Sequence, residues 1–162
     1  MKRKGFFKTV LLTGLFAGLL DLISAYVTQW ATTGKFAGKM LNYIAAGALG
    51  LGPALEGGNA VQFLGLFFHF FIAFSFTLFF FIIFPRVKIL AYNKYLVGML
   101  YAVFVNLFMG QVVLRLSRLP VGPFSVSGSI VGWIVFGIVF GIPIAWNAYR
   151  FYQVSPSTNE SI

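Results

Sequence analysis

The sequence predicts an all-α membrane protein, with four transmembrane helices in a bundle and a short amphipathic external helix. Four long apolar segments lie at about 9–31, 59–84, 95–114 and 129–149, each close to or above the roughly 20 residues that span a bilayer core. Charged residues make up only 9% of the chain, whereas a soluble domain carries about a quarter. The 21 Phe and three Trp would leave large apolar patches in water.

The apolar segments and their links fill residues 1–152, which we expect to form a single transmembrane domain. The polar tail 153–162 is expected to be disordered. The basic start of the chain resembles the beginning of a signal peptide, but the apolar run continues past Asp21 to Trp30 without a clear cleavage site. A retained first span is therefore the preferred interpretation.

The link at about 35–49 predicts a short amphipathic helix. Lys35, Lys39 and Asn42 fall on one helical face, and apolar residues fall on another. This pattern suits a helix in the headgroup plane, but it equally suits a connecting helix packed on the bundle. Gly50 and the residues after it are expected to end the helix.

The basic residues lie at the ends of the apolar segments and give a net charge of +9. Eight of the 12 Lys and Arg residues fall on the side that holds both termini, and four fall on the other. The positive-inside rule then places both termini in the cytoplasm of a multi-pass cell-membrane protein. The lipid bilayer and its anionic headgroups are the expected partners, and the absence of a basic stripe argues against nucleic acid.

Three polar residues lie inside three different apolar segments, namely Asp21, His69 and Asn106. Counted at 1.5 Å per residue, all three fall roughly 16–18 Å from the cytoplasmic edge, near the midplane. An ionisable group at this depth usually faces other helices or a water-filled cavity. In one hypothesis the three residues hydrogen-bond to each other or to backbone and fix the helix packing. In the other they line an externally reachable cavity for a proton, an ion or a polar headgroup.

Small residues share the helical faces of Asp21 and His69, which favours close helix contacts. The fourth segment holds two Gly-x-x-x-Gly patterns of the same kind. Toward the outer end of the third segment, Gln111 and Arg115 share a face, where Arg115 would attract an anionic ligand. The glycines predicted to lie at helix contacts are Gly14, Gly18, Gly128, Gly132, Gly137 and Gly141.

Catalysis is the least favoured function. The chain has no Cys, one His and three carboxylates, too few for a convincing catalytic zinc site. It also lacks a phosphate-binding loop and a nucleophile elbow, so no cofactor is predicted. The leading hypothesis is a small transporter or ligand-binding protein. The alternative is an accessory or assembly subunit, and with only four spans a homo-oligomer or a larger complex is expected.

Several short motifs together resemble a group of small, uncharacterised four-span bacterial inner-membrane proteins. The resemblance implies the same four-span topology and an inner-membrane location, and it carries no activity with it. The motifs are Ala17-Gly-Leu-Leu-Asp21-Leu, Gly57-Gly58, Leu66-Phe-Phe-His69-Phe-Phe-Ile-Ala73, Asn106, Pro123-Phe-Ser125 and Gly141-Ile-Pro143-Ile-Ala145.

Overall fold

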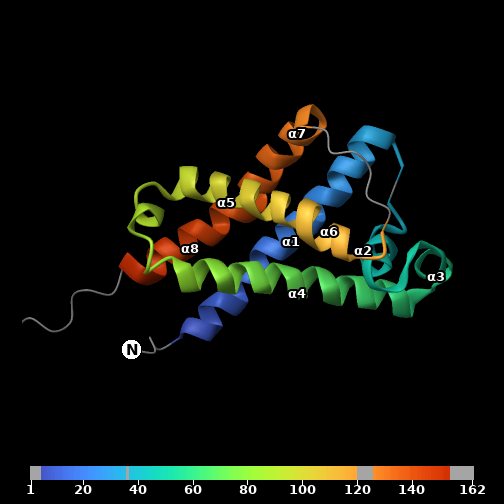
Figure 1. The fold of residues 1–162 in the computed structure, drawn as a ribbon, viewed down its shortest axis with the longest axis horizontal. Helices are drawn as coiled ribbons and strands as arrows, with labels where there is room; N and C mark the ends of the chain where they lie inside the picture. The colour runs from blue at the N-terminus through green and yellow to red at the C-terminus, as the bar shows by residue number, and fades with distance from the viewer. Residues whose placement is uncertain (1–4, 36, 120–125, 154–162) are drawn as a thin grey trace, which may run out of the picture.

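Four long helical segments pack side by side in a computed structural model of the protein (Figure 1). The structure describes residues 5–35, 37–119 and 126–153, with side chains from 130 onward in the last range. The first two segments are α1 (Phe6–Thr33) and α4 (Asn59–Ile83). The third spans Lys94–Leu116, and the fourth spans Ile130–Tyr152. All four are long and apolar enough to cross a membrane, which confirms the predicted all-α bundle.

The third and fourth segments each contain a turn of π-helix. The third consists of α5 (Lys94–Phe108), η2 (Met109–Val113) and α6 (Leu114–Leu116). The fourth consists of α7 (Val126–Phe136), η3 (Gly137–Gly141) and α8 (Ile142–Gln153). Pro143 lies two residues after the end of η3 and has no N–H to donate to the preceding turn, so a wider turn at this point relieves the clash of its ring. The residues after Gln153, including most of the predicted tail, lie outside the described part of the chain.

Glycine and asparagine set the ends of the helices. Gly34 (φ 65°) ends α1, and Gly50 (φ 88°) separates α2 (Met40–Leu49) from α3 (Leu51–Glu56). Both have the left-handed φ that glycine adopts without strain. After the 3₁₀ turn η1 (Lys88–Ala91), Asn93 caps α5 by accepting hydrogen bonds from the N–H groups of Tyr95 and Leu96.

The connecting helix α2 packs against α4 instead of standing apart from the bundle. The two backbones are so close that a Cβ at Gly65 would overlap the carbonyl of Leu41. Asn42 is only 1% exposed, and its Nδ2 donates to the carbonyls of Ala54 and Gly57 at 2.8 and 3.0 Å. Asn42 therefore departs from the predicted polar face, and the arrangement matches the alternative of a connecting helix packed on the bundle.

The helices form a ring in which neighbours differ in how closely they approach. α1 packs against α4 and against η3–α8, and α5 also packs against η3–α8. Aromatic side chains fill the contact between α4 and α5, where the rings of Phe80 and Tyr101 lie 4.6 Å apart. The start of α1 and the end of α8 lie at one end of the bundle, and α2, α3 and α6 lie at the other (Figure 1).

Most of the buried apolar side chains lie toward the end of the bundle that holds the start of α1 and the end of α8, a part called the terminal half below. The remainder, which carries α2, α3 and α6, is called the α2 half. In the terminal half, the ring of Phe84 stacks on Tyr152 at 5.3 Å, and Tyr152 Oη donates to the carbonyl of Phe81 at 2.8 Å. The fully buried core side chains there include Phe80, Phe81 and Ile144.

Candidate functional site

His69 lies at the contact between α1 and α4. Its Nε2 is 2.8 Å from the carbonyl oxygen of Gly18. A carbonyl oxygen only accepts hydrogen bonds, so Nε2 carries the hydrogen and Nδ1 is the nitrogen that takes up a second proton. A Cβ at Gly18 would lie 3.1 Å from the Cβ of Ala73 and 3.2 Å from the Phe70 ring. Glycine at this position thus allows the close approach that the hydrogen bond requires.

Asp21 lies one turn beyond Gly18 on α1, and its carboxylate interacts electrostatically with His69. Both side chains are half-buried. The backbone carbonyl of Asp21 accepts a hydrogen bond from Ser24 Oγ at 2.8 Å. The two ionisable side chains that the sequence places in apolar segments therefore lie near enough across the α1–α4 contact to interact electrostatically, without a hydrogen bond or an ion pair between them.

Asn106 bonds to a residue that the sequence analysis did not single out. Its Oδ1 accepts a hydrogen bond from Trp133 Nε1 at 2.9 Å, which links α5 to α7. A half-buried indole N–H needs an acceptor in an apolar environment, and the amide of Asn106 supplies it. The hydrogen bonds of His69 and Asn106 therefore run to a backbone carbonyl and to Trp133, and none joins two members of the trio.

Gln111 and Arg115 lie outside both of these pairs. Gln111 is exposed in the π-helical turn η2, and Arg115 is exposed in α6. They occupy the surface of the α2 half, consistent with their expected place near one end of the third segment.

Four of the six predicted contact glycines lie at close helix contacts. Gly14 and Gly18 face α4, where a Cβ at Gly14 would lie 2.5 Å from the Phe74 ring. Gly137 and Gly141 face α5, and a Cβ at Gly141 would overlap the carbonyl of Gly98.

Gly132 differs from the other predicted contact glycines, because it is exposed and no atom would lie within 4 Å of its Cβ. Gly132 is exposed because it lies on the face of α7 that points away from α5. It therefore makes no helix contact in the described part of the chain. The surroundings of Gly128 lie outside the described residues. Gly65, which shares the helical face of His69, and Gly98 also make backbone contacts. No Gly-x-x-x-Gly pattern marks Gly98 in the sequence.

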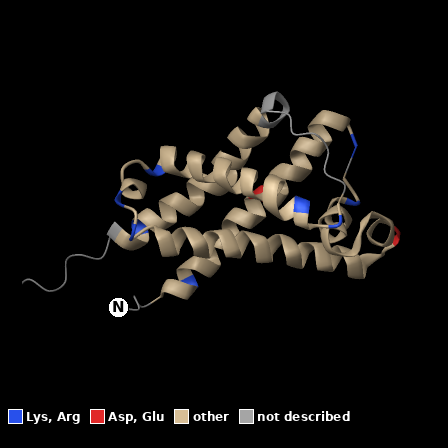
Figure 2. Ribbon diagram, viewed as in Figure 1, with Lys and Arg blue, Asp and Glu red and all other residues tan. Residues whose placement is uncertain are grey.

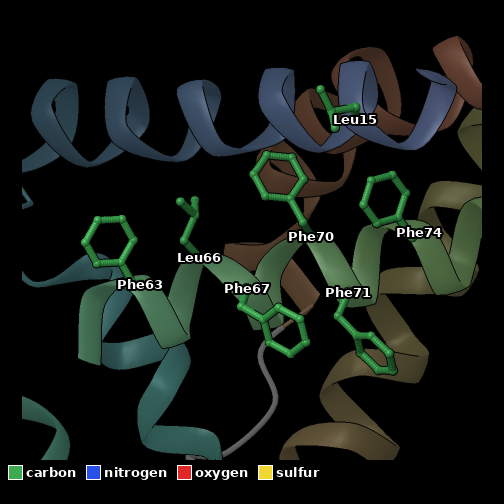
Figure 3. Close-up of a pocket in the computed structure, with 7 residues that line it drawn as sticks. All are labelled: Leu15, Phe63, Leu66, Phe67, Phe70, Phe71 and Phe74. Atoms are coloured by element: carbon green, nitrogen blue, oxygen red, sulfur yellow. The ribbon is translucent and has the colours of Figure 1, made fainter. Parts of the chain in front are cut away.

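An apolar hollow of about 430 Å³ lies beside the α1–α4 contact (Figure 3). Phe70 and Phe74 point from α4 toward α1, whereas Phe67 and Phe71 point away from it. Leu15 of α1 closes one side of the hollow. Its lining is apolar, which suits contact with hydrocarbon. Among the described residues, no group of three His, Asp or Glu side chains is placed to hold a metal ion.

The surface around these sites is apolar, and the basic residues gather at the two ends of the bundle (Figure 2). Large side chains such as Phe63, Phe67 and Leu12 are 57–71% exposed. At one end, Lys94 Nζ lies 3.8 Å from the centre of the Trp146 ring, the kind of anchor found at a membrane interface. The chain is therefore a multi-pass integral membrane protein whose outer surface contacts lipid.

Comparison of the chain with protein-family models, with curated proteins and with solved structures finds no match. The functional argument therefore rests on the residues and contacts described above.

Proposed function

We propose that the protein is a small transporter or ligand-binding membrane protein that binds a proton or a cation at Asp21 and His69. The observation that carries the proposal is the pairing of these two residues across the α1–α4 contact, with His69 Nε2 held at 2.8 Å from the Gly18 carbonyl. An acid and an imidazole that interact electrostatically inside a membrane domain are suited to a proton relay.

The hydrogen bond to Gly18 gives the two ring nitrogens of His69 separate roles. Nε2 stays bonded to α1, and Nδ1 gains or loses the proton. When the imidazole is protonated, its charge is balanced by the carboxylate of Asp21. A change in this balance alters the attraction between α1 and α4, so proton uptake is coupled to the contact between the helices.

We further propose that the protein resides in a bacterial inner membrane with both termini in the cytoplasm. The excess of Lys and Arg on the side of the termini supports this orientation, and the sequence resemblance supports the location. In this orientation Arg115 faces the external side.

The test uses the protein in liposomes, with proton flux read by a pH-sensitive dye after an imposed pH gradient. Asp21→Asn and His69→Phe are each expected to abolish flux, because each removes one of the two proton-binding groups. Glu56→Gln is the matched control, since Glu56 is exposed outside the four spans and the change removes the same charge. Wild-type flux in a folded Asp21→Asn protein would refute the proposed role.

The alternative function, an accessory or assembly subunit, is supported by Gly132. This glycine lies on the exposed face of α7 beside Val131, which is 68% exposed, and a partner helix could approach closely there. Under this alternative, Gly132→Leu lowers the yield of a stoichiometric partner, or of a homo-oligomer, measured by native mass spectrometry of gently extracted protein. An unchanged assembly in that variant counts against the alternative.

A further inference from the structure

A second hollow, of about 570 Å³, lies in the α2 half between α2, α4 and the α5–η2–α6 segment. Its deep part is lined by Phe68 and Ile72 of α4 and by Met109 of η2. Its shallow part is lined by Gly47 of α2 and by Ser117 after α6. From Met109 to Leu116 the third segment rises about 10 Å, so the hollow is an apolar groove that runs partway into the membrane. We call it the α2 groove.

The walls of the α2 groove are held together at its shallow end. The N–H of Arg118 donates to the carbonyl of Gly47 at 3.0 Å, which ties the end of the third segment to α2. On the opposite side, α2 is fixed to α4 by the close approach of Leu41 and Gly65. The groove is therefore a defined feature of the fold, and its width does not depend on a single side chain.

The groove has an apolar lining, and two arginines alternate in sequence with the residues that line its shallow end. Arg115 lies between the lining residues Leu114 and Leu116, and Arg118 lies between Ser117 and Leu119. Both arginines are exposed, and neither forms an ion pair with a carboxylate in the described ranges. Lys39, which precedes the lining residue Met40, is engaged elsewhere, because its Nζ donates to the carbonyl of Leu55 at 2.9 Å.

We propose that the α2 groove binds one acyl chain of an anionic phospholipid, whose phosphate pairs with Arg115 and Arg118. A groove of this volume is within the range of ligand pockets, and its apolar lining matches hydrocarbon. The two arginines match the phosphate, since a guanidinium donates paired hydrogen bonds to such an anion. Basic sites between transmembrane helices bind anionic headgroups in this way.

Two methionines give the groove the adaptability that a flexible acyl chain requires. Met40 and Met109 line it from opposite walls, and unbranched thioether side chains fit ligands of variable shape. A soluble anion such as inorganic phosphate would occupy the arginines and leave the apolar interior unfilled. The apolar lining and the two arginines together therefore favour a lipid over a soluble anion.

The test is native mass spectrometry of the full chain with phosphatidylglycerol and phosphatidylcholine of identical acyl chains. Wild-type protein is expected to retain phosphatidylglycerol in preference. The variant R115Q/R118Q is expected to lose that preference, about fivefold for each arginine. Ala48→Trp, which places a large side chain in the groove from α2, is expected to lower retention of both lipids.

Matched controls separate the groove from general lipid contact. R86Q/K88Q removes two charges at the other end of the bundle, and Ala31→Trp adds a ring to the exposed face of α1. Both controls are expected to retain lipid as the wild type does. Equal retention of the two lipids by the wild type overturns the proposal. So does a preference that survives R115Q/R118Q, or Ala48→Trp that alters the oligomeric state without lowering lipid retention.

Discussion

The terminal half and the α2 half of the bundle are built in different ways. In the terminal half, aromatic side chains such as Phe81, Phe84 and Tyr152 stack on one another around a fully buried core. In the α2 half, the helices hold together through polar pairs and a connecting helix, and the α2 groove separates α4 from the third segment. Dense packing at one end thus coexists with an open groove at the other.

The difference shows where the molecule has room for ligands. In a membrane, helices gain little from hiding apolar surface, so close packing and hydrogen bonds determine which contacts last. In the terminal half, closely packed aromatic side chains form most of the contacts between helices. The α2 half leaves its ionisable residues Asp21 and His69 half-buried, and its arginines lie at the groove. Stability and binding are therefore expected to respond to mutations in different halves.

The largest expected effect is on the backbone contact between α5 and η3. Gly141→Leu places a side chain against the carbonyl of Gly98 and should lower the free energy of unfolding by about 3 kcal/mol or more, because neither backbone can move aside cheaply. SDS-induced unfolding, followed by circular dichroism, measures the change. Gly132→Leu is the control, since no atom lies within 4 Å of its Cβ. Equal losses in the two variants would contradict the assignment of this contact.

The next largest effect contrasts a core ring with a lipid-facing ring. Phe81 is fully buried and Phe67 is 61% exposed. Phe81→Ala should cost about 3 kcal/mol because it leaves a cavity among packed rings, whereas Phe67→Ala lets lipid fill the space and should change stability little. Thermal unfolding in the same bilayer measures both. A similar loss in the two variants would mean that the terminal half lacks the tight core described here.

The smallest expected effect concerns the hydrogen bond between Trp133 and Asn106. A double-mutant cycle with Trp133→Phe and Asn106→Leu should give a coupling energy of about 0.6 to 1 kcal/mol, the usual strength of such bonds in membranes. SDS unfolding of the wild type, both single variants and the double variant measures it. A coupling energy of zero would show that the bond does not hold α5 against α7.

The sequence predicted the four helices because each has a long apolar run with few charges, a signal that depends on composition alone. It also indicated Asp21 and His69, since an ionisable residue stands out in such a run. It could not assign partners, because depth in the membrane does not determine which neighbour a helix faces. Asn106 meets Trp133 for this reason, although its estimated depth matches that of Asp21 and His69.

Local breaks in the helices were harder to foresee. Pro143 was visible in the sequence, but a proline two residues after Gly141 does not distinguish a kink from a π-helical turn. The amphipathic pattern placed Asn42 on the polar face of the helix. In the structure Asn42 is buried, because its amide donates hydrogen bonds to the carbonyls of Ala54 and Gly57. A polar residue on a predicted helix face can thus be buried and hydrogen-bond two segments of the protein together.

The π-helical turn η2 sets the direction in which Arg115 points. One residue in an α-helix corresponds to a rotation of about 100°, and a π-helical turn accommodates one residue more than an α-helical turn. If Met109–Val113 were wound as a regular α-helix with no residue removed, α6 would be turned by about that angle relative to α5. The direction of Arg115 beside the α2 groove is therefore governed by the winding of one helical turn, as well as by the arginine itself.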